Sequence, residues 1–131
     1  MRHAFLLFGL TLLGCVAQAA PSNALVGSEW RFVSIDGEAP ASDKAGLNFD
    51  IDRLGATVGC NRMNGPWRIE KERLIAGPMM QTKMFCDGPV GDQEQEVGAL
   101  LVSGPELMLV GHRLSLRSHG HSAELERVDA R

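Results

Sequence analysis

The hydrophobic pattern divides the chain into an apolar beginning and a strand-rich remainder. Residues 4–14 form an uncharged apolar run. From residue 26 onward, apolar and polar side chains alternate with a period of two, which is typical of β-strands that bury one face. The segment 47–52 alternates most cleanly, because Leu47, Phe49 and Ile51 fall on one face and polar residues fall on the other.

Eight segments of this kind predict strands, and they are separated by residues that favour turns, mainly Gly, Pro, Asn and Asp. The expected strands cover residues 30–35, 47–52, 56–60, 67–70, 73–77, 107–110, 113–116 and 123–126. The connecting segments predict a tether at 20–25, a loop at 38–46, a turn at 53–55, a hinge at 61–66 and an irregular stretch at 78–89.

One helix is expected between residue 89 and the Gly104-Pro105 pair, which would end it. Pro89 suits a first helical turn, and we assign Glu94 and Glu96 to a solvated helix face. Its apolar stripe consists of Val90, Val97, Leu100 and Leu101. These elements predict a β-rich α+β fold: a single antiparallel, curved sheet or partly closed barrel of about seven or eight strands, with one covering helix.

Residues 1–19 are predicted to be a secretion signal, which leaves residues 20–131 as one domain. The apolar run is too short to span a bilayer, and Ala17-Gln18-Ala19 supplies the small residues that signal peptidase requires. In a competing interpretation, Leu12-Leu13-Gly14-Cys15 resembles a bacterial lipobox, and Cys15 becomes a lipidated membrane anchor. Both interpretations predict export, to the periplasm or to another part of the cell envelope.

The charge balance excludes two classes of partner. The chain has 131 residues, with 13 Lys and Arg against 16 Asp and Glu, and loss of Arg2 with the signal lowers the formal net charge from −3 to −4. Such a surface gives no reason to expect nucleic acid or attraction to anionic lipid. We therefore expect a monomer that contacts a membrane only through a lipid on Cys15.

Cleavage after Ala19 would leave Cys60 and Cys86 as the only cysteines. Two thiols in an oxidising compartment favour a disulfide. Closing a loop of about 27 residues would stabilise the fold by about 3–4 kcal/mol. The alternative of two buried free thiols stays open, because spacing alone does not test the geometry.

Four segments, in the same order, resemble the META domain family. Leu25-Val26-Gly27-Ser28-Glu29-Trp30 resembles its opening Leu-x-Gly-x-x-Trp motif, and residues 107–116 resemble its closing hairpin. Residues 59–65 are similar to a Gly-Cys-Asn-x-x-x-Gly signature, and residues 82–86 are similar to Thr-x-Met-x-Cys. The signature positions are Gly59, Cys60, Asn61, Gly65, Thr82, Met84 and Cys86. The resemblance covers residues 25–128.

This resemblance implies a small β-rich domain with one helix, similar to the HslJ-like bacterial heat-shock proteins of the envelope. The family has no established catalytic residues, and its members are associated with heat induction and novobiocin tolerance. We therefore expect a non-catalytic, stress-related envelope protein that acts by binding or structural support, with an unidentified envelope protein or apolar ligand as partner. The alternative is a carrier similar to the pilot lipoproteins of type III secretion, which hold an acyl chain or peptide in a cracked barrel.

Other chemistry finds little support in the sequence, and we expect no cofactor. Met63, Met79, Met80 and Met84 offer soft ligands for Cu(I), but methionine also fills gaps in cores. His112, His119 and His121 fall short of a zinc pattern. Arg62 and Lys83 keep a redox-active cysteine pair open as an alternative. The chain lacks Gly-x-Ser-x-Gly, and no motif places a nucleophile beside a histidine, so we predict that it is not an enzyme.

Overall fold

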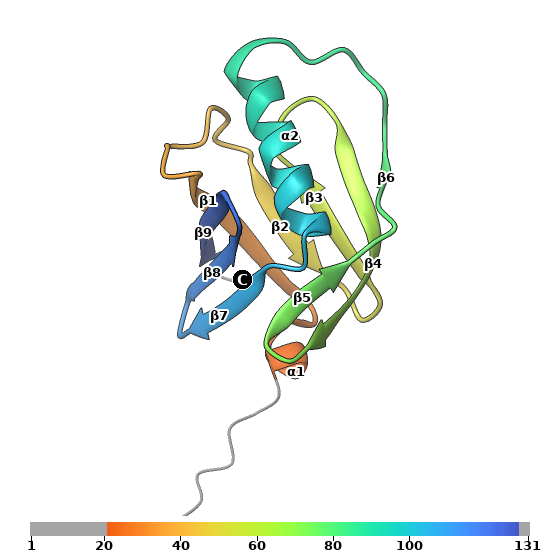
Figure 1. Ribbon diagram of the computed structural model, residues 1–131, viewed down its shortest axis with the longest axis vertical. Helices are drawn as coiled ribbons and strands as arrows, with labels where there is room; N and C mark the ends of the chain where they lie inside the picture. Colours follow the sequence, from red (N-terminus) through yellow and green to blue (C-terminus); the bar gives the residue numbers. More distant parts are fainter. Residues whose placement is uncertain (1–20, 129–131) are drawn as a thin grey trace, which may run out of the picture.

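The strands form one antiparallel sheet that closes on itself. The computed structural model describes residues 21–128 (Figure 1); the predicted signal and Cys15 lie outside this range. The strands are β1 (Ser28–Ile35), β2 (Gly46–Phe49), β3 (Arg53–Thr57), β4 (Arg62–Glu70), β5 (Arg73–Ala76), β6 (Met80–Gln81), β7 (Glu106–Val110), β8 (Arg113–Ser118) and β9 (His121–Arg127); the helices are α1 (Pro21–Leu25) and α2 (Gly88–Val102).

The sheet order is β3-β2-β1-β9-β8-β7-β5-β4-β6, and β3 also pairs with β4. Eight strands therefore close into a barrel, and the two-residue β6 pairs with β4 outside that ring. The predicted β-rich α+β class, with a curved sheet and one substantial helix, is confirmed. The barrel is closed more completely than we expected.

Alternate side chains of the strands fill the barrel, as the period-two pattern predicts. Trp30 and Phe32 point inward from β1, and Leu114 and Leu116 point inward from β8. A register shift between Phe32 and Ser34 opposite β9 lets Ile35 point inward as well. Twenty apolar side chains are buried in one cluster. Their burial is the main source of stability in a domain of this size.

Helix α2 packs against β9 and β5, and also touches β1 and β8. Asp87 caps its N-terminus, since its side chain accepts a hydrogen bond from the Gly88 amide at 2.7 Å. The helix ends before Gly104, as predicted. Of the predicted apolar stripe, three members (Val97, Leu100 and Leu101) are buried and Val90 is half-buried.

The predicted turn at 53–55 is wrong. Strand β2 ends at Phe49, and the chain turns at residues 50–52, where the Asp50 amide donates to the Arg53 carbonyl oxygen at 2.8 Å. Ile51 therefore stands on a turn and is 81% exposed, although its spacing had placed it beside Leu47 and Phe49 in the core. The reversal comes three residues earlier than the pattern suggested.

The predicted hinge at 61–66 is also wrong, because residues 62–66 form the first half of β4. Two partners hold them extended: β3 pairs along residues 62–66, and β6 pairs with Met63 and Asn64. Gly65 is needed here, since a Cβ atom at this position would lie 2.6 Å from the Pro78 carbonyl oxygen. Gly65 thus lies at the point of β4 that the chain at Pro78 approaches closely.

The predicted tether at 20–25 contains the short helix α1, whose Leu25 is fully buried. Ser28 links α1 to the core: its hydroxyl donates to the Leu25 carbonyl oxygen and accepts from the Trp30 indole nitrogen at 2.7 Å. Gly27 has a φ of 76° and donates to the Phe49 carbonyl oxygen. Helix α1 and the start of α2 lie at opposite ends of the molecule (Figure 1).

Candidate functional site

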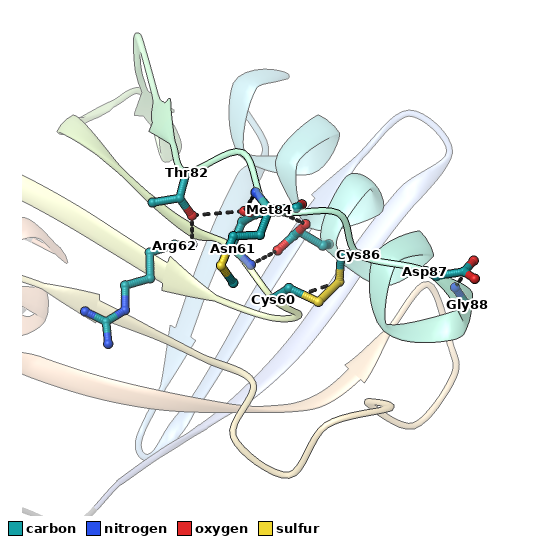
Figure 2. Close-up of a disulfide and its surroundings, with 9 residues drawn as sticks. Cys60, Asn61, Arg62, Thr82, Met84, Cys86, Asp87 and Gly88 are labelled. Carbon is teal, nitrogen blue, oxygen red and sulfur yellow. Dashed lines mark hydrogen bonds between the residues drawn. A yellow bond between two sulfur atoms is a disulfide. The ribbon is translucent and has the colours of Figure 1, made fainter.

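The two signature segments meet at one corner of the barrel, beside the start of α2 (Figure 2). We call this cluster the Asn61 corner and define it by Cys60, Asn61, Thr82, Met84, Cys86 and Glu94. Its residues come from the turn before β4, from the connection between β6 and α2, and from α2 itself. Residues 82–87 of that connection, called the 82–87 loop below, are held against the barrel by the contacts that follow.

Asn61 is the centre of the corner, and every polar group of its side chain is used. Its amide nitrogen donates to the Met84 carbonyl oxygen at 3.0 Å and to Glu94 Oε2 at 2.9 Å. Its amide oxygen accepts from the Met84 backbone nitrogen at 2.6 Å and from the Thr82 hydroxyl at 3.0 Å. Asn61 therefore pairs with both backbone groups of Met84, much as a neighbouring strand would.

Glu94 lies beneath Asn61 with only 4% of its surface exposed. Its Oε1 accepts from the Asn61 backbone nitrogen at 2.6 Å, and its Oε2 accepts from the Asn61 side chain. The prediction that Glu94 lies on a solvated helix face is wrong. Glu96, which was predicted on the same face, is half-buried. A carboxylate buried this deeply needs such donors, since an unpaired one would be costly to bury.

Thr82 joins the start of the 82–87 loop to β4. Its hydroxyl donates to Asn61 Oδ1 and accepts from the Arg62 backbone nitrogen at 3.0 Å. Its own backbone nitrogen donates to the Arg62 carbonyl oxygen at 3.2 Å. This side chain serves as donor and acceptor at once, which a hydroxyl group can do.

A disulfide between Cys60 and Cys86 closes the other end of the loop, with Cα atoms 5.6 Å apart. Of the two alternatives that the sequence left open, the structure contains the bonded pair. The Cys60 backbone nitrogen also donates to the Cys86 sulfur at 3.2 Å. The loop is thus fixed covalently at Cys86 and by hydrogen bonds at Thr82 and Met84.

Two glycines make room for Cys86. A Cβ atom on Gly59 would lie 2.8 Å from the Val90 carbonyl oxygen and 3.1 Å from the Cys86 sulfur. A Cβ atom on Gly91 would overlap the Cys86 carbonyl group. Side chains at these positions would push the disulfide away from the helix. Gly59, in the first signature segment, therefore leaves room for the Cys86 sulfur. Gly91 allows the second signature segment to pack on α2 at Cys86.

The 82–87 loop holds its polar contacts inward and exposes apolar side chains. Phe85 is 91% exposed and Met84 is 60% exposed, and Met80 in the adjoining β6 is 68% exposed. A single exposed apolar residue is ordinary on a protein surface. Three such residues lie within a short stretch of chain, and two of them, Met84 and Phe85, belong to the loop that the disulfide and the Glu94–Asn61 pair hold in place. We call Met80, Met84 and Phe85 the apolar tip.

The other predicted candidates do not come together. Met63 is buried, whereas Met80 and Met84 are exposed, and both cysteines are bonded to each other. His121 pairs with Asp36 at 3.1 Å, and His112 and His119 are exposed. Within residues 21–128, no three His, Cys, Asp or Glu side chains are grouped so that they could hold a metal ion.

The barrel interior offers no support for an acyl-chain carrier. Its axis is occupied by the buried cluster, in which Trp30 and Phe49 are the largest fully buried side chains. A cavity of about 260 Å³ lies on the surface beside β7, and charged residues such as Lys71, Glu72 and Arg117 contribute to its lining. Acyl chains bind in apolar cavities. In the described part of the chain, no helix is long and apolar enough to cross a membrane.

Sequence reasoning found the signature residues but missed Glu94. The helical pattern placed Glu94 among several acidic and amide residues, and none of them carried a motif. A signal was nevertheless present: Glu94 lies three residues before Val97 and seven before Leu101, both in the apolar stripe. That spacing puts it on the buried face of the helix.

Two solved structures share this fold. One, determined by NMR, has a TM-score of 0.73 and 20% sequence identity, covering 82% of this chain and 95% of that chain. The other, an NMR structure of a protein from Burkholderia xenovorans, has a TM-score of 0.66 and 20% identity, covering 87% and 95%. A search of curated proteins found no match.

The family comparison covers almost the whole described range. The sequence model of the META domain matches residues 23–130, which include the opening motif, both signature segments and the closing hairpin. All of the signature residues except Gly65 build the Asn61 corner or make room for it. The chain therefore belongs to the META domain family.

Proposed function

We propose that this chain is a non-catalytic, stress-related protein of the cell envelope that acts by binding an apolar segment of another envelope protein through the apolar tip. The observation that carries the proposal is the arrangement of the 82–87 loop. Asn61, Thr82 and Glu94 direct their polar atoms toward the loop backbone or toward one another, while Phe85 is 91% exposed.

The contacts of the corner support binding rather than catalysis. Glu94 and Asn61 are hydrogen-bonded to each other, and Asn61 is bonded to the loop backbone. Groups engaged in this way hold a backbone in place, and the fixed loop lowers the entropy that binding would otherwise cost. Aromatic residues and methionine are enriched at protein interfaces, so the side chains of the apolar tip suit that role.

Export is part of the proposal, and two features support it. The N-terminal pattern of residues 1–19 is typical of a secretion signal. The disulfide between Cys60 and Cys86 is typical of proteins that work in an oxidising compartment. Whether the signal is cut after Ala19 or before Cys15 is decided by the intact mass of protein recovered from the envelope.

Site-specific photocrosslinking tests the binding surface. A benzoylphenylalanine replaces Phe85 in one protein and Ile51 in the other, since Ile51 is also highly exposed but lies on the β2–β3 turn. Crosslinking takes place in cells of the native host under heat stress. We expect a discrete adduct from position 85 that is absent from position 51.

Competition then shows whether the adduct depends on the apolar tip. Excess unlabelled protein should suppress it, whereas excess M84S/F85S protein should suppress it about tenfold less, because burying an aromatic side chain contributes about 1.5–3 kcal/mol. Both substitutions change exposed residues, so the stability of the variant should stay within about 0.5 kcal/mol of the parent. Equal competition by the two proteins, or the same adduct from both labelled positions, would contradict the proposal.

A growth assay tests the link to stress. A strain that carries M84S/F85S in place of the native gene should lose heat tolerance to the same extent as a deletion strain. The I51S strain serves as the matched control and should grow like the parent. Normal heat tolerance of the M84S/F85S strain would show that the stress-related role does not require the apolar tip.

A further inference from the structure

The two sulfur atoms of the disulfide have different surroundings. Cys60 is exposed on the turn that precedes β4, whereas Cys86 is half-buried beside the first turn of α2. The Cys86 sulfur lies where a Cβ atom on Gly59 would be only 3.1 Å away, and Val90 occupies the same crowded space. A reagent from solvent therefore meets Cys60 before it meets Cys86.

The structure also favours Cys86 as the sulfur that would carry negative charge. The Cys60 backbone nitrogen donates to the Cys86 sulfur at 3.2 Å, and Cys86 is two residues before the start of α2, near the positive end of the helix dipole. Both features lower the energy of a thiolate. Asp87 is the nearest opposing charge in sequence, but its carboxylate is exposed and is engaged by the Gly88 amide.

From this asymmetry we propose that Cys60 is a modification site, attacked by an external thiolate, with Cys86 as the leaving group. The thiolate sulfur forms a bond to Cys60 Sγ as the bond between Cys60 Sγ and Cys86 Sγ breaks, and the electron pair of that bond remains on Cys86 Sγ. The attacking sulfur is oxidised to the disulfide level and Cys86 is reduced to a thiolate. The proton of the incoming thiol goes to solvent before attack.

This inference does not rest on the proposed binding function. It depends on the exposure of Cys60, on the packing around Cys86, on the hydrogen bond to the Cys86 sulfur and on the position of Cys86 just before α2. Its consequence for the fold is local: the covalent restraint at the end of the 82–87 loop is removed, while the hydrogen bonds of Asn61 and Thr82 remain available.

Glutathione provides a direct test on the unmodified, oxidised protein. After a brief reaction at mildly alkaline pH, remaining thiols are alkylated and peptides are mapped by mass spectrometry. We expect glutathione on Cys60 and the alkyl group on Cys86, in about tenfold excess over the reverse pattern, because the rate depends on access and on the leaving thiolate. Tryptophan fluorescence from Trp30 and Trp67 verifies that the protein stays folded during labelling.

The same reaction in concentrated urea is the control. Unfolding removes the packing and the helix, so the preference should fall to near parity. Glutathione mainly on Cys86, equal labelling of the two cysteines in the folded protein, an unchanged preference in urea, or no adduct on the folded protein would each overturn the inference.

A second arm identifies the kind of thiol that the site suits. It uses a thioredoxin-fold protein whose second active-site cysteine is replaced by serine, so that the mixed disulfide is stable. Attack on Cys60 with a rate constant about tenfold above that of glutathione at equal thiolate concentration identifies a protein thiol as the favoured reagent. A smaller ratio identifies a small thiol, and trapping on Cys86 overturns the inference in this arm too.

Discussion

Two neighbouring side chains of α2 each tie down a loop, and they do so in different ways. Gln93 holds the 38–45 loop between β1 and β2: its Oε1 accepts from the Ala41 backbone nitrogen at 2.7 Å, and its Nε2 donates to the Ala39 carbonyl oxygen at 2.9 Å. Glu94 holds Asn61, which in turn holds the 82–87 loop.

The difference lies in how many restraints act together. Between its ends, which bond to the backbone of β1, the 38–45 loop is held to α2 by one neutral amide side chain, whereas the 82–87 loop has a buried carboxylate, an asparagine, a threonine and a disulfide. The loop that exposes Met84 and Phe85 is therefore the more firmly held of the two. The signature positions 82, 84 and 86 lie in the 82–87 loop, and the 38–45 loop contains no signature position.

Removal of the disulfide should have the largest effect on this contrast. The double variant C60S/C86S should lose about 3.5 kcal/mol of unfolding free energy, because the unfolded chain is no longer closed into a loop; the cysteines are 26 residues apart. Urea unfolding of the variant and of the parent measures the loss. The reduced parent is the control and should match the variant. A loss below about 1 kcal/mol would contradict the expectation that the disulfide contributes more to stability than the hydrogen bonds of the corner.

Glu94→Ala should cost about 3 kcal/mol, since it removes the acceptor of the Asn61 backbone N–H and of one of the two N–H groups of the Asn61 side chain. Glu94→Gln keeps one acceptor and should cost about half as much. Urea unfolding measures both, and hydrogen exchange at the Met84 amide should accelerate in the alanine variant. Gln95→Ala is the matched control, because Gln95 is exposed on the same helix. Equal stability of the Glu94 and Gln95 variants would remove the basis for the corner as described.

Gln93→Ala should cost less, about 1–2 kcal/mol, because it removes two neutral hydrogen bonds. The exchange of the Ala41 amide should accelerate while that of Met84 stays unchanged. Amide exchange followed by NMR measures both sites at once. Faster exchange at Met84 in this variant would show that the two loops are coupled through α2 rather than held separately.

The smallest effect concerns Glu96, an acidic residue of α2 that lies near other carboxylates. Burial raises the pKa of Glu96, and the negative charges of Asp36, Glu38 and Asp92 raise it further. Because the pKa is higher in the folded state than in the unfolded state, ionisation of Glu96 opposes folding as the pH rises through that interval. Glu96→Gln should therefore raise the unfolding free energy at pH 7. The gain should vanish below about pH 4, where the carboxyl group is protonated in both states. Thermal unfolding across this pH range measures the difference.

Most of the barrel could be predicted from the sequence, since alternation marks strands that bury one face. The errors fall where contacts between distant segments decide the structure. Gly65-Pro66 has the composition of a turn, yet both residues pair with β3 and stay extended. Ile51 continues an alternating pattern, yet the chain has already turned.

In the candidate site, too, the sequence predicted some features, and contacts in the folded chain decided the others. Its signature residues were visible as a family resemblance, but nothing in the sequence joined Glu94 to Asn61, which is 33 residues away. The pairing depends on how α2 lies across the barrel, and a helical pattern gives the buried face without naming the partner. The exposure of Phe85 was equally hidden, because a Met- and Phe-containing stretch is as consistent with a core as with a surface.

Helix α1 and the 82–87 loop lie at opposite ends of the barrel (Figure 1), so the two ends of the molecule differ in structure. A surface that holds the protein by the α1 end presents the 82–87 loop outward, with the length of the barrel as a spacer. Attachment through the residues just before α1 is therefore the better point of immobilisation, since it directs the 82–87 loop into the solution. The same arrangement keeps any contact made at α1 and any contact made at the loop a barrel's length apart.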